Sequence, residues 1–263
     1  MKKFIERITY AISFIVMLSL GLGLTSVFVG CTKKNQVSGE QASSKIIAST
    51  SWTAAFADLA GLDNVDAIAP ANLRHPPEYE VTVSDIQKIS DSDVFIFAGF
   101  ERMMKTLGDS IEGVNMIKIT CDNSIETVTS ETAKIAQAMG TQAEAEKRVA
   151  EYVAAIQKGR EQIEKAGLMG AKVYCNKNQT YLAKDLGFEI AAVFGPGPAT
   201  SEQIAAAKEN SYAFIIDNIH NPTGTPIAEV SDAKYIIWRN FPEKVEHNAL
   251  KKVVEENIKI IFN

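Results

Sequence analysis

The sequence has 263 residues, of which 46% are hydrophobic and 22% are charged, and its formal net charge is −5 at pH 7. This is ordinary globular composition, and the length suits one large domain or two smaller ones. The acidic balance argues against nucleic acid as a partner, because nucleic-acid binding normally needs a basic surface.

Residues 1–30 predict an export signal. Lys2, Lys3 and Arg7 precede a continuous apolar run that ends just before Cys31. A positively charged start followed by an apolar core is typical of a secretory signal peptide. The run is nearly long enough to cross a bilayer as a helix, so an uncleaved membrane anchor is the alternative.

The segment VFVGC resembles a bacterial lipobox, in which a small residue precedes the lipidated cysteine, here Cys31. Phe28 departs from that pattern, because it is bulkier than the usual leucine. The following residues, 31–44, are polar and rich in Ser and Gln, which suits a flexible tether. We therefore predict an extracytoplasmic protein of the cell envelope that is anchored to the membrane through a lipid on Cys31.

Apolar runs of strand length alternate with helical patterns from Lys45 to the end of the chain. The expected strands lie in KIIAST, VDAIAP, DVFIFAG, VNMIKIT, AKVYCN, FEIAAVF, YAFIID and AKYIIW. This alternation predicts an α/β fold with parallel sheets. Ser84 is a plausible N-cap for the short helix VSDIQKIS, and the last helix is expected from Lys244 onward.

One helical pattern is longer than all the others. Residues 141–167 contain no proline, and their apolar positions recur at helical spacing. We therefore predict two α/β lobes of parallel sheets with flanking helices, at residues 45–140 and 168–263, joined by one long rigid helix over most of residues 142–166. A helix lying on the surface or in a coiled coil is the alternative for this segment.

This organisation resembles the solute-binding lipoproteins of zinc and manganese ABC importers. That family carries Pro-His-x-Tyr-Glu-x-Thr-x-Ser-Asp, a short helix, and then Asp, a hydrophobic strand and Gly-x-Glu. Here the corresponding stretches read PPEYEVTVSD, IQKIS and DSDVFIFAGFE. In the second half, NQTYLAKDLGFEI, TSEQIAAAKEN and IAEVSDAKYIIW also fit, so the resemblance covers residues 45–263.

The resemblance implies an extracytoplasmic binding protein. The family's four metal-ligand positions carry other residues here. The first ligand position falls on Pro77. The second falls near Asp122, Asn123 or Ser124, and the third near Asn176. The fourth falls near Arg239 or Asn240. A transported divalent metal ion of the zinc or manganese class is nevertheless the expected cargo, passed to an ABC permease and its ATPase by a monomeric protein.

His75 lies two residues before the expected ligand position, in a loop that Pro76 and Pro77 stiffen by fixing φ. We predict that it faces the cleft and binds metal together with Glu101 and His220. Asp122, Asp217 or water would fill the remaining position. A solvent-exposed loop histidine is the alternative for His75, and an ordinary turn residue is the alternative for His220.

Cys121 and Cys175 occupy equivalent strand ends in the two halves. Separate buried thiols, metal ligands and a disulfide all remain open for this pair. A second hypothesis starts from the replaced ligands: Asn123, Asn176, Asn178 and Arg239 would donate hydrogen bonds to a non-metal anion or a metal chelate. A third is an adhesion-type surface lipoprotein. The common motifs of catalysis and nucleotide binding do not occur in the sequence, so an enzyme is not expected.

Overall fold

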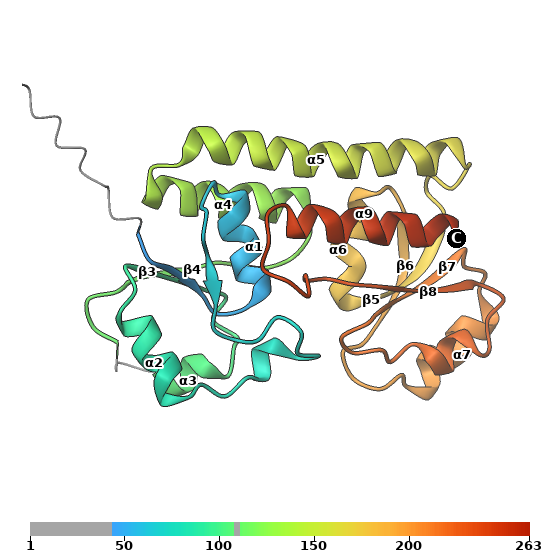
Figure 1. The fold of residues 1–263 in the computed structure, drawn as a ribbon. Coiled ribbons are helices and arrows are strands. Elements are labelled where there is room, and N and C mark those ends of the chain that lie inside the picture. Colours follow the sequence, from blue (N-terminus) through green and yellow to red (C-terminus); the bar gives the residue numbers. More distant parts are fainter. Residues whose placement is uncertain (1–43, 108–110) are drawn as a thin grey trace, which may run out of the picture. The chain divides into compact units, whose positions relative to one another are not determined.

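The computed structural model describes residues 44–107 and 111–263, so the predicted export signal, most of the tether and Cys31 lie outside the described residues. The described part contains two sheets of four parallel strands, each flanked by helices (Figure 1). The predicted α/β fold with two lobes is therefore confirmed. No helix within the described part is long and apolar enough to cross a membrane.

The two sheets share one topology. The first sheet has the order β2-β1-β3-β4 and the second has the order β6-β5-β7-β8. The strands of the first sheet are β1 (Ile46–Ala48), β2 (Asp66–Ala67), β3 (Val94–Phe97) and β4 (Asn115–Lys118). The strands of the second sheet are β5 (Lys172–Asn176), β6 (Glu189–Phe194), β7 (Phe214–Asn218) and β8 (Lys234–Trp238). In both sheets the strand order reverses between the first and third strands in chain order, and ligands of open α/β sheets bind at such a point, beyond the carboxyl ends of the strands.

Helices fill the connections that the sequence predicted. They are α1 (Ser51–Leu59), α2 (Val83–Ser90), α3 (Met103–Leu107), α4 (Ile125–Met139), α5 (Gln142–Lys165), α6 (Thr180–Asp185), α7 (Ser201–Glu209), α8 (Thr225–Ala228) and α9 (Ala249–Phe262), with short 3-10 turns at Pro76–Glu78 and Lys177–Gln179. The N-cap of α2 is Thr82, not Ser84. The Thr82 hydroxyl accepts from Asp85 N, and the Asp85 carboxylate accepts from Thr82 N, which forms a capping box.

The last helix begins later than the periodicity predicted. Asn248, directly before α9, has a φ of 61°, in the left-handed region that a right-handed helix cannot contain. The chain from Lys244 to His247 therefore precedes the helix. His247 Nδ1 lies 2.8 Å from Asp58 Oδ1, and Asn248 N donates to Asp58 Oδ2, so this segment of the second lobe is held by α1 of the first.

Helix α5 runs alongside both lobes, as the uninterrupted pattern predicted (Figure 1). Its 24 residues correspond to about 36 Å at 1.5 Å per residue. Tyr152, Ile156 and Ile163 on α5 are fully buried, and they belong to one apolar core that also contains Phe56 of the first lobe and Trp238 of the second. A shared core of this kind opposes wide opening of the two lobes.

Hydrogen bonds also join the lobes beside the sheets. Asn123 Nδ2 donates to the carbonyl of Asn240 over 2.9 Å, and Ser51 Oγ donates to the carbonyl of Pro242 over 2.7 Å. The Asn123 carbonyl in turn accepts from Tyr152 Oη on α5. These bonds fix the distance between the strand ends of the two lobes, which is where the candidate site lies.

Candidate functional site

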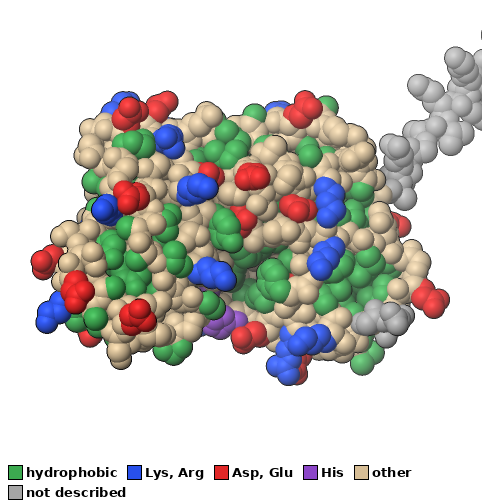
Figure 2. Space-filling view, turned by 180° about the vertical axis from the view of Figure 1, so that it is seen from behind, with side chains coloured by type: hydrophobic (Ala, Val, Ile, Leu, Met, Phe, Trp, Pro, Cys, Tyr) green, Lys and Arg blue, Asp and Glu red, His purple; other side chains and the backbone are tan. Residues whose placement is uncertain are grey.

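A cavity of about 410 Å³ lies where the carboxyl ends of the two sheets meet. Its lining comes from both lobes: Trp52, His75, Pro77, Glu78, Phe100, Cys121 and Asp122 from the first, and Asn178, Tyr181, Asn218, His220, Asn221, Asn240 and Phe241 from the second. Figure 2 shows that acidic and basic side chains are interspersed on the face opposite to that of Figure 1, with a histidine near a hollow in the middle. We call the cavity of about 410 Å³ the interlobe cavity.

His220 is the buried histidine of the interlobe cavity. It follows β7 closely, it is only 7% exposed, and its ring stacks on Phe241 with a centroid distance of 3.5 Å and an interplanar angle of 16°. Its Nδ1 lies 3.3 Å from the carbonyl oxygen of Arg74 in the opposite lobe. Its Nε2 is buried and has no hydrogen-bond partner among the described residues.

The surroundings of His220 determine which nitrogen carries the proton. Burial, together with the positive charge of Arg239, lowers the pKa of His220 to about 4, so the ring is neutral at pH 7. A carbonyl oxygen can only accept, so Nδ1 is assigned the proton and donates it to Arg74. The lone pair of Nε2 is then free to bind a ligand. Histidines that bind metals typically donate their other ring N–H in this way.

This burial predicts a pH dependence of stability. The unfolded chain protonates His220 at its ordinary pKa of 6.5, whereas the folded chain does so only near a pKa of about 4. Stability contributed by the neutral ring is therefore complete above pH 6.5 and is lost as the pH falls toward 4. Between pH 7 and about pH 4, we expect the free energy of unfolding of the wild type to fall by about 3 kcal/mol more than that of His220→Gln.

Chemical denaturation in the presence of EDTA, which keeps both proteins metal-free, measures this difference. All other titrating groups are common to the two proteins and cancel in the comparison. Parallel pH profiles for the wild type and His220→Gln would contradict the burial of a neutral imidazole.

His75 lines the same cavity from the opposite lobe. It is exposed, and it precedes the 3-10 turn Pro76–Glu78. The contact between the Arg74 carbonyl and His220 holds this loop against the second lobe. Pro77, two residues after His75, also lines the cavity, so this loop brings both residues to it.

Glu101 does not line the interlobe cavity. It is 1% exposed, and its carboxylate accepts hydrogen bonds from Ser49 Oγ, from Ala98 N over 2.8 Å and from Gly99 N over 2.6 Å. It thus closes the strand ends of β1 and β3 from within the first lobe. These bonds give the carboxylate a structural task at the point where the strand order reverses.

Asp217 has the equivalent task in the second lobe. It is fully buried at the end of β7, and its carboxylate accepts from Asn176 Nδ2, from the backbone N–H groups of Asn218 and Gly224, and from Tyr235 Oη. Burial and the hydrogen bond to Asp217 raise the pKa of Tyr235 to about 12. Like Glu101, Asp217 lies behind the cavity lining.

The remaining candidates divide between the lining and the interior. Asp122 and Cys121 line the cavity, but the Asp122 carboxylate already accepts from Ser124 and Thr127 at the start of α4. Cys175 is buried in the apolar core. Both cysteines are free, so the disulfide alternative is wrong, and burial raises the pKa of both thiols.

Three further candidates support the site from outside the lining. Asn123 joins the lobes, as described above, and Asn176 orients Asp217. Arg239 lies beside the cavity, where its guanidinium contacts Glu243 and its backbone N–H donates to Asn257. Among the described residues, no group of three or more His, Cys, Asp or Glu side chains is arranged to hold a metal ion. The set of His75, Glu101 and His220 that the sequence predicted is therefore not assembled in the structure.

Sequence reasoning named Asn178 and Asn240 but missed the aromatic side chains of the lining and the amides of Asn218 and Asn221. Phe100 and Tyr181, one from each lobe, remain 58% and 42% exposed at the cavity. Asn218 and Asn221 flank His220, and this clustering of amides around a histidine after a buried strand was the available signal. Asn240 is 6% exposed, and its Oδ1 has no hydrogen-bond partner among the described residues.

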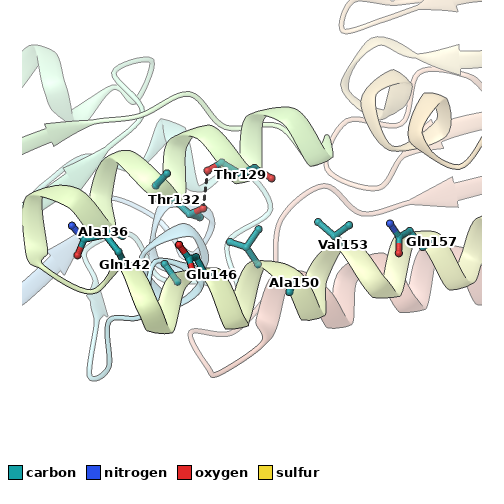
Figure 3. A pocket seen from close by; sticks show the side chains of 11 residues that line it. Thr129, Thr132, Ala136, Gln142, Glu146, Ala150, Val153 and Gln157 are labelled. Atoms are coloured by element: carbon teal, nitrogen blue, oxygen red, sulfur yellow. Dashed lines mark hydrogen bonds between the residues drawn. The ribbon is translucent and has the colours of Figure 1, made fainter. Parts of the chain in front are cut away.

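A second hollow, of about 570 Å³, lies between α4 and α5 (Figure 3). Its lining is mainly alanine, valine and threonine methyl groups, with Gln142, Glu146 and Gln157 along α5. It contains no histidine or cysteine and lies on helices, away from the strand ends. The interlobe cavity, which combines an unpartnered imidazole with polar groups from both lobes, is therefore the stronger candidate site.

No family model matches the sequence, and no curated protein matches it. The fold does match solved structures. The solute-binding protein FpvC from Pseudomonas aeruginosa in complex with Mn²⁺ is 17% identical over 82% of this chain and 96% of that chain, with a TM-score of 0.64. The laminin-binding protein Lmb of Streptococcus agalactiae, described as bifunctional with adhesin and metal transporting activity, is 16% identical over 83% and 99%, with a TM-score of 0.61.

A cadmium-bound periplasmic metal-binding protein from Candidatus Liberibacter asiaticus is 16% identical over 83% of this chain and 98% of that chain, with a TM-score of 0.61. At these identities the comparisons establish the fold. The described chain therefore has the fold of metal-binding solute-binding proteins, as the resemblance in sequence predicted.

Proposed function

We propose that this protein is the solute-binding component of an ABC importer and that it captures a divalent metal ion in the interlobe cavity for delivery to a permease. The shared fold supports the general role, because solved proteins with this architecture are described as solute-binding or metal-binding. The cavity at the carboxyl ends of both sheets supports the place of binding.

The observation that carries the proposal is the state of His220. A buried, neutral imidazole whose Nδ1 is held by the Arg74 carbonyl, and whose Nε2 has no partner among the described residues, is a preformed metal ligand. His75 supplies a second imidazole from the other lobe. Imidazole nitrogen suits zinc better than manganese, which prefers oxygen donors, so zinc is the ion that we favour.

The proposed setting is the outer face of a membrane. The apolar run, VFVGC and the polar tether support lipidation of Cys31, which would hold a monomeric binding protein near its permease.

An adhesion-type function on the same fold is the second candidate, because Lmb is described as both an adhesin and a metal transporter. This chain has an exposed aromatic pair, Phe100 and Tyr181, beside the cavity. These side chains also suit a ligand inside the cavity, so their exposure does not distinguish adhesion from ligand binding. Metal binding is therefore measured first, and adhesion second.

Isothermal titration calorimetry tests the proposal. The full-length protein, purified in detergent without a histidine tag and stripped with EDTA, is titrated with Zn²⁺ and with Mn²⁺. We expect one zinc ion per chain and weaker binding of manganese. Absence of heat and of bound metal for both ions, with the protein folded by circular dichroism, would reject the proposed function.

A further inference from the structure

We propose that the cargo of the interlobe cavity is a cationic complex of a metal ion with a small organic chelator that bears N–H groups. The inference rests on the metal-binding function proposed above and narrows its cargo. Three observations support this inference: the small number of metal-binding side chains, the size and lining of the cavity, and the unpartnered Oδ1 of Asn240.

The protein supplies fewer donors than a zinc ion usually takes. Zinc bound by protein alone uses three or four side chains. Here His75 and His220 line the cavity, whereas Glu101 and Asp217 are committed to hydrogen bonds behind it. No described group of three donor side chains converges. A chelator would supply the remaining donor atoms, which water supplies when Zn²⁺ binds alone.

The cavity has the size of a small organic ligand. Its volume of about 410 Å³ is far larger than the roughly 30 Å³ that one water molecule occupies in the liquid. Cavities of roughly 300–1,000 Å³ with aromatic lining are typical of small-molecule sites. Phe100 and Tyr181, which are 58% and 42% exposed, line the interlobe cavity from opposite lobes. Their ring faces attract cations.

The polar lining selects for N–H donors and positive charge. Asn240 Oδ1 is buried without a partner among the described residues, and a buried acceptor of this kind is satisfied by an N–H from the ligand. Glu78 and Asp122 are the carboxylates of the lining, and Arg239, which lies beside the cavity, is paired with Glu243 over 2.5 Å. A chelator with coordinated amines, which leaves the metal complex positively charged, meets both requirements.

The experiment uses diethylenetriamine in mildly alkaline buffer, where its three amines bind zinc in their uncharged form and keep their N–H groups. One equivalent leaves zinc with at least one open position for an imidazole, whereas an excess forms a bis complex of the same charge with no open position. Native mass spectrometry and calorimetry are performed on the untagged full-length protein with Zn²⁺ alone, with one equivalent of diethylenetriamine, and with an excess.

We expect a ternary complex of protein, zinc and chelator at one equivalent, with an affinity at least equal to that for Zn²⁺ alone, and loss of that complex in excess chelator. If one equivalent strips zinc from a protein that binds Zn²⁺ alone, the inference is overturned and the proposed function stands. If zinc is bound in neither form, the proposed function and this inference are both rejected.

A matched pair of variants tests the aromatic lining. Phe100→Ala removes an exposed ring at the cavity and should weaken the ternary complex about fivefold, as expected for an exposed cation–π contact. Phe262→Ala removes a ring of similar exposure, 44%, at the end of α9, and it should leave the affinity unchanged. If the two variants bind the zinc–chelator complex with equal affinity, the inference that the cargo contains an organic chelator is overturned.

Discussion

Replacement of Asp217 by alanine is expected to destabilise the protein by roughly 3–5 kcal/mol, the range for breaking a buried, hydrogen-bonded charge network. The Asp217 carboxylate is fully buried and accepts from Asn176, Tyr235 and two backbone N–H groups within 3.0 Å. Alanine would leave these donors without a partner in the interior, where each unsatisfied group costs free energy. Urea denaturation measures the change.

Asp232→Ala is the matched control, because Asp232 is an exposed aspartate of the same lobe. Its effect should stay within about 0.5 kcal/mol. The folded Asp217→Ala protein should also retain zinc binding, since the carboxylate lies behind the cavity lining. A stable Asp217→Ala variant that no longer binds zinc would instead make Asp217 a ligand and reverse the structural role assigned to it.

Replacement of His220 by alanine is expected to weaken zinc binding at least about 100-fold, because the loss of a ligand exceeds the 10- to 100-fold effect of losing a group that only orients one. His220 contributes the unpartnered Nε2, and its Nδ1–H holds the loop that carries His75. The variant therefore loses one donor and the positioning of the other. Calorimetry with Zn²⁺ measures the affinity.

His247→Gln is the control for this experiment. His247 is the third histidine of the chain and contacts Asp58, outside the interlobe cavity. Its replacement should leave zinc affinity unchanged. Circular dichroism of each variant separates loss of binding from loss of fold. Undiminished zinc binding by folded His220→Ala would remove His220 from the site.

Local patterns in the sequence predicted the elements of the fold because strand and helix periodicities depend on near neighbours. The eight strands and the long helix α5 follow such patterns. The start of α9 was misplaced because Asn248 takes a left-handed conformation and Asp58, 190 residues away, binds its N–H. Contacts between residues so far apart in the sequence cannot be predicted from local periodicity.

The candidate site was predicted less completely than the fold. The sequence indicates an acid after β3, Glu101, and one at the end of β7, Asp217. It does not indicate that backbone N–H groups already bind both carboxylates. Likewise, Phe241 is part of the site because its ring stacks on His220, and a stacking partner is set by how loops from different strands meet. His75 was found because its loop has a recognisable motif.

Zinc K-edge X-ray absorption of the zinc-loaded, untagged full-length protein tests most directly whether His220 binds metal in the interlobe cavity. We predict nitrogen ligands at about 2.0–2.1 Å with the outer-shell scattering of imidazole. That imidazole signal should be lost or sharply reduced in His220→Ala and preserved in His247→Gln. An imidazole signal that is the same in the wild type and His220→Ala would contradict a metal site built on His220.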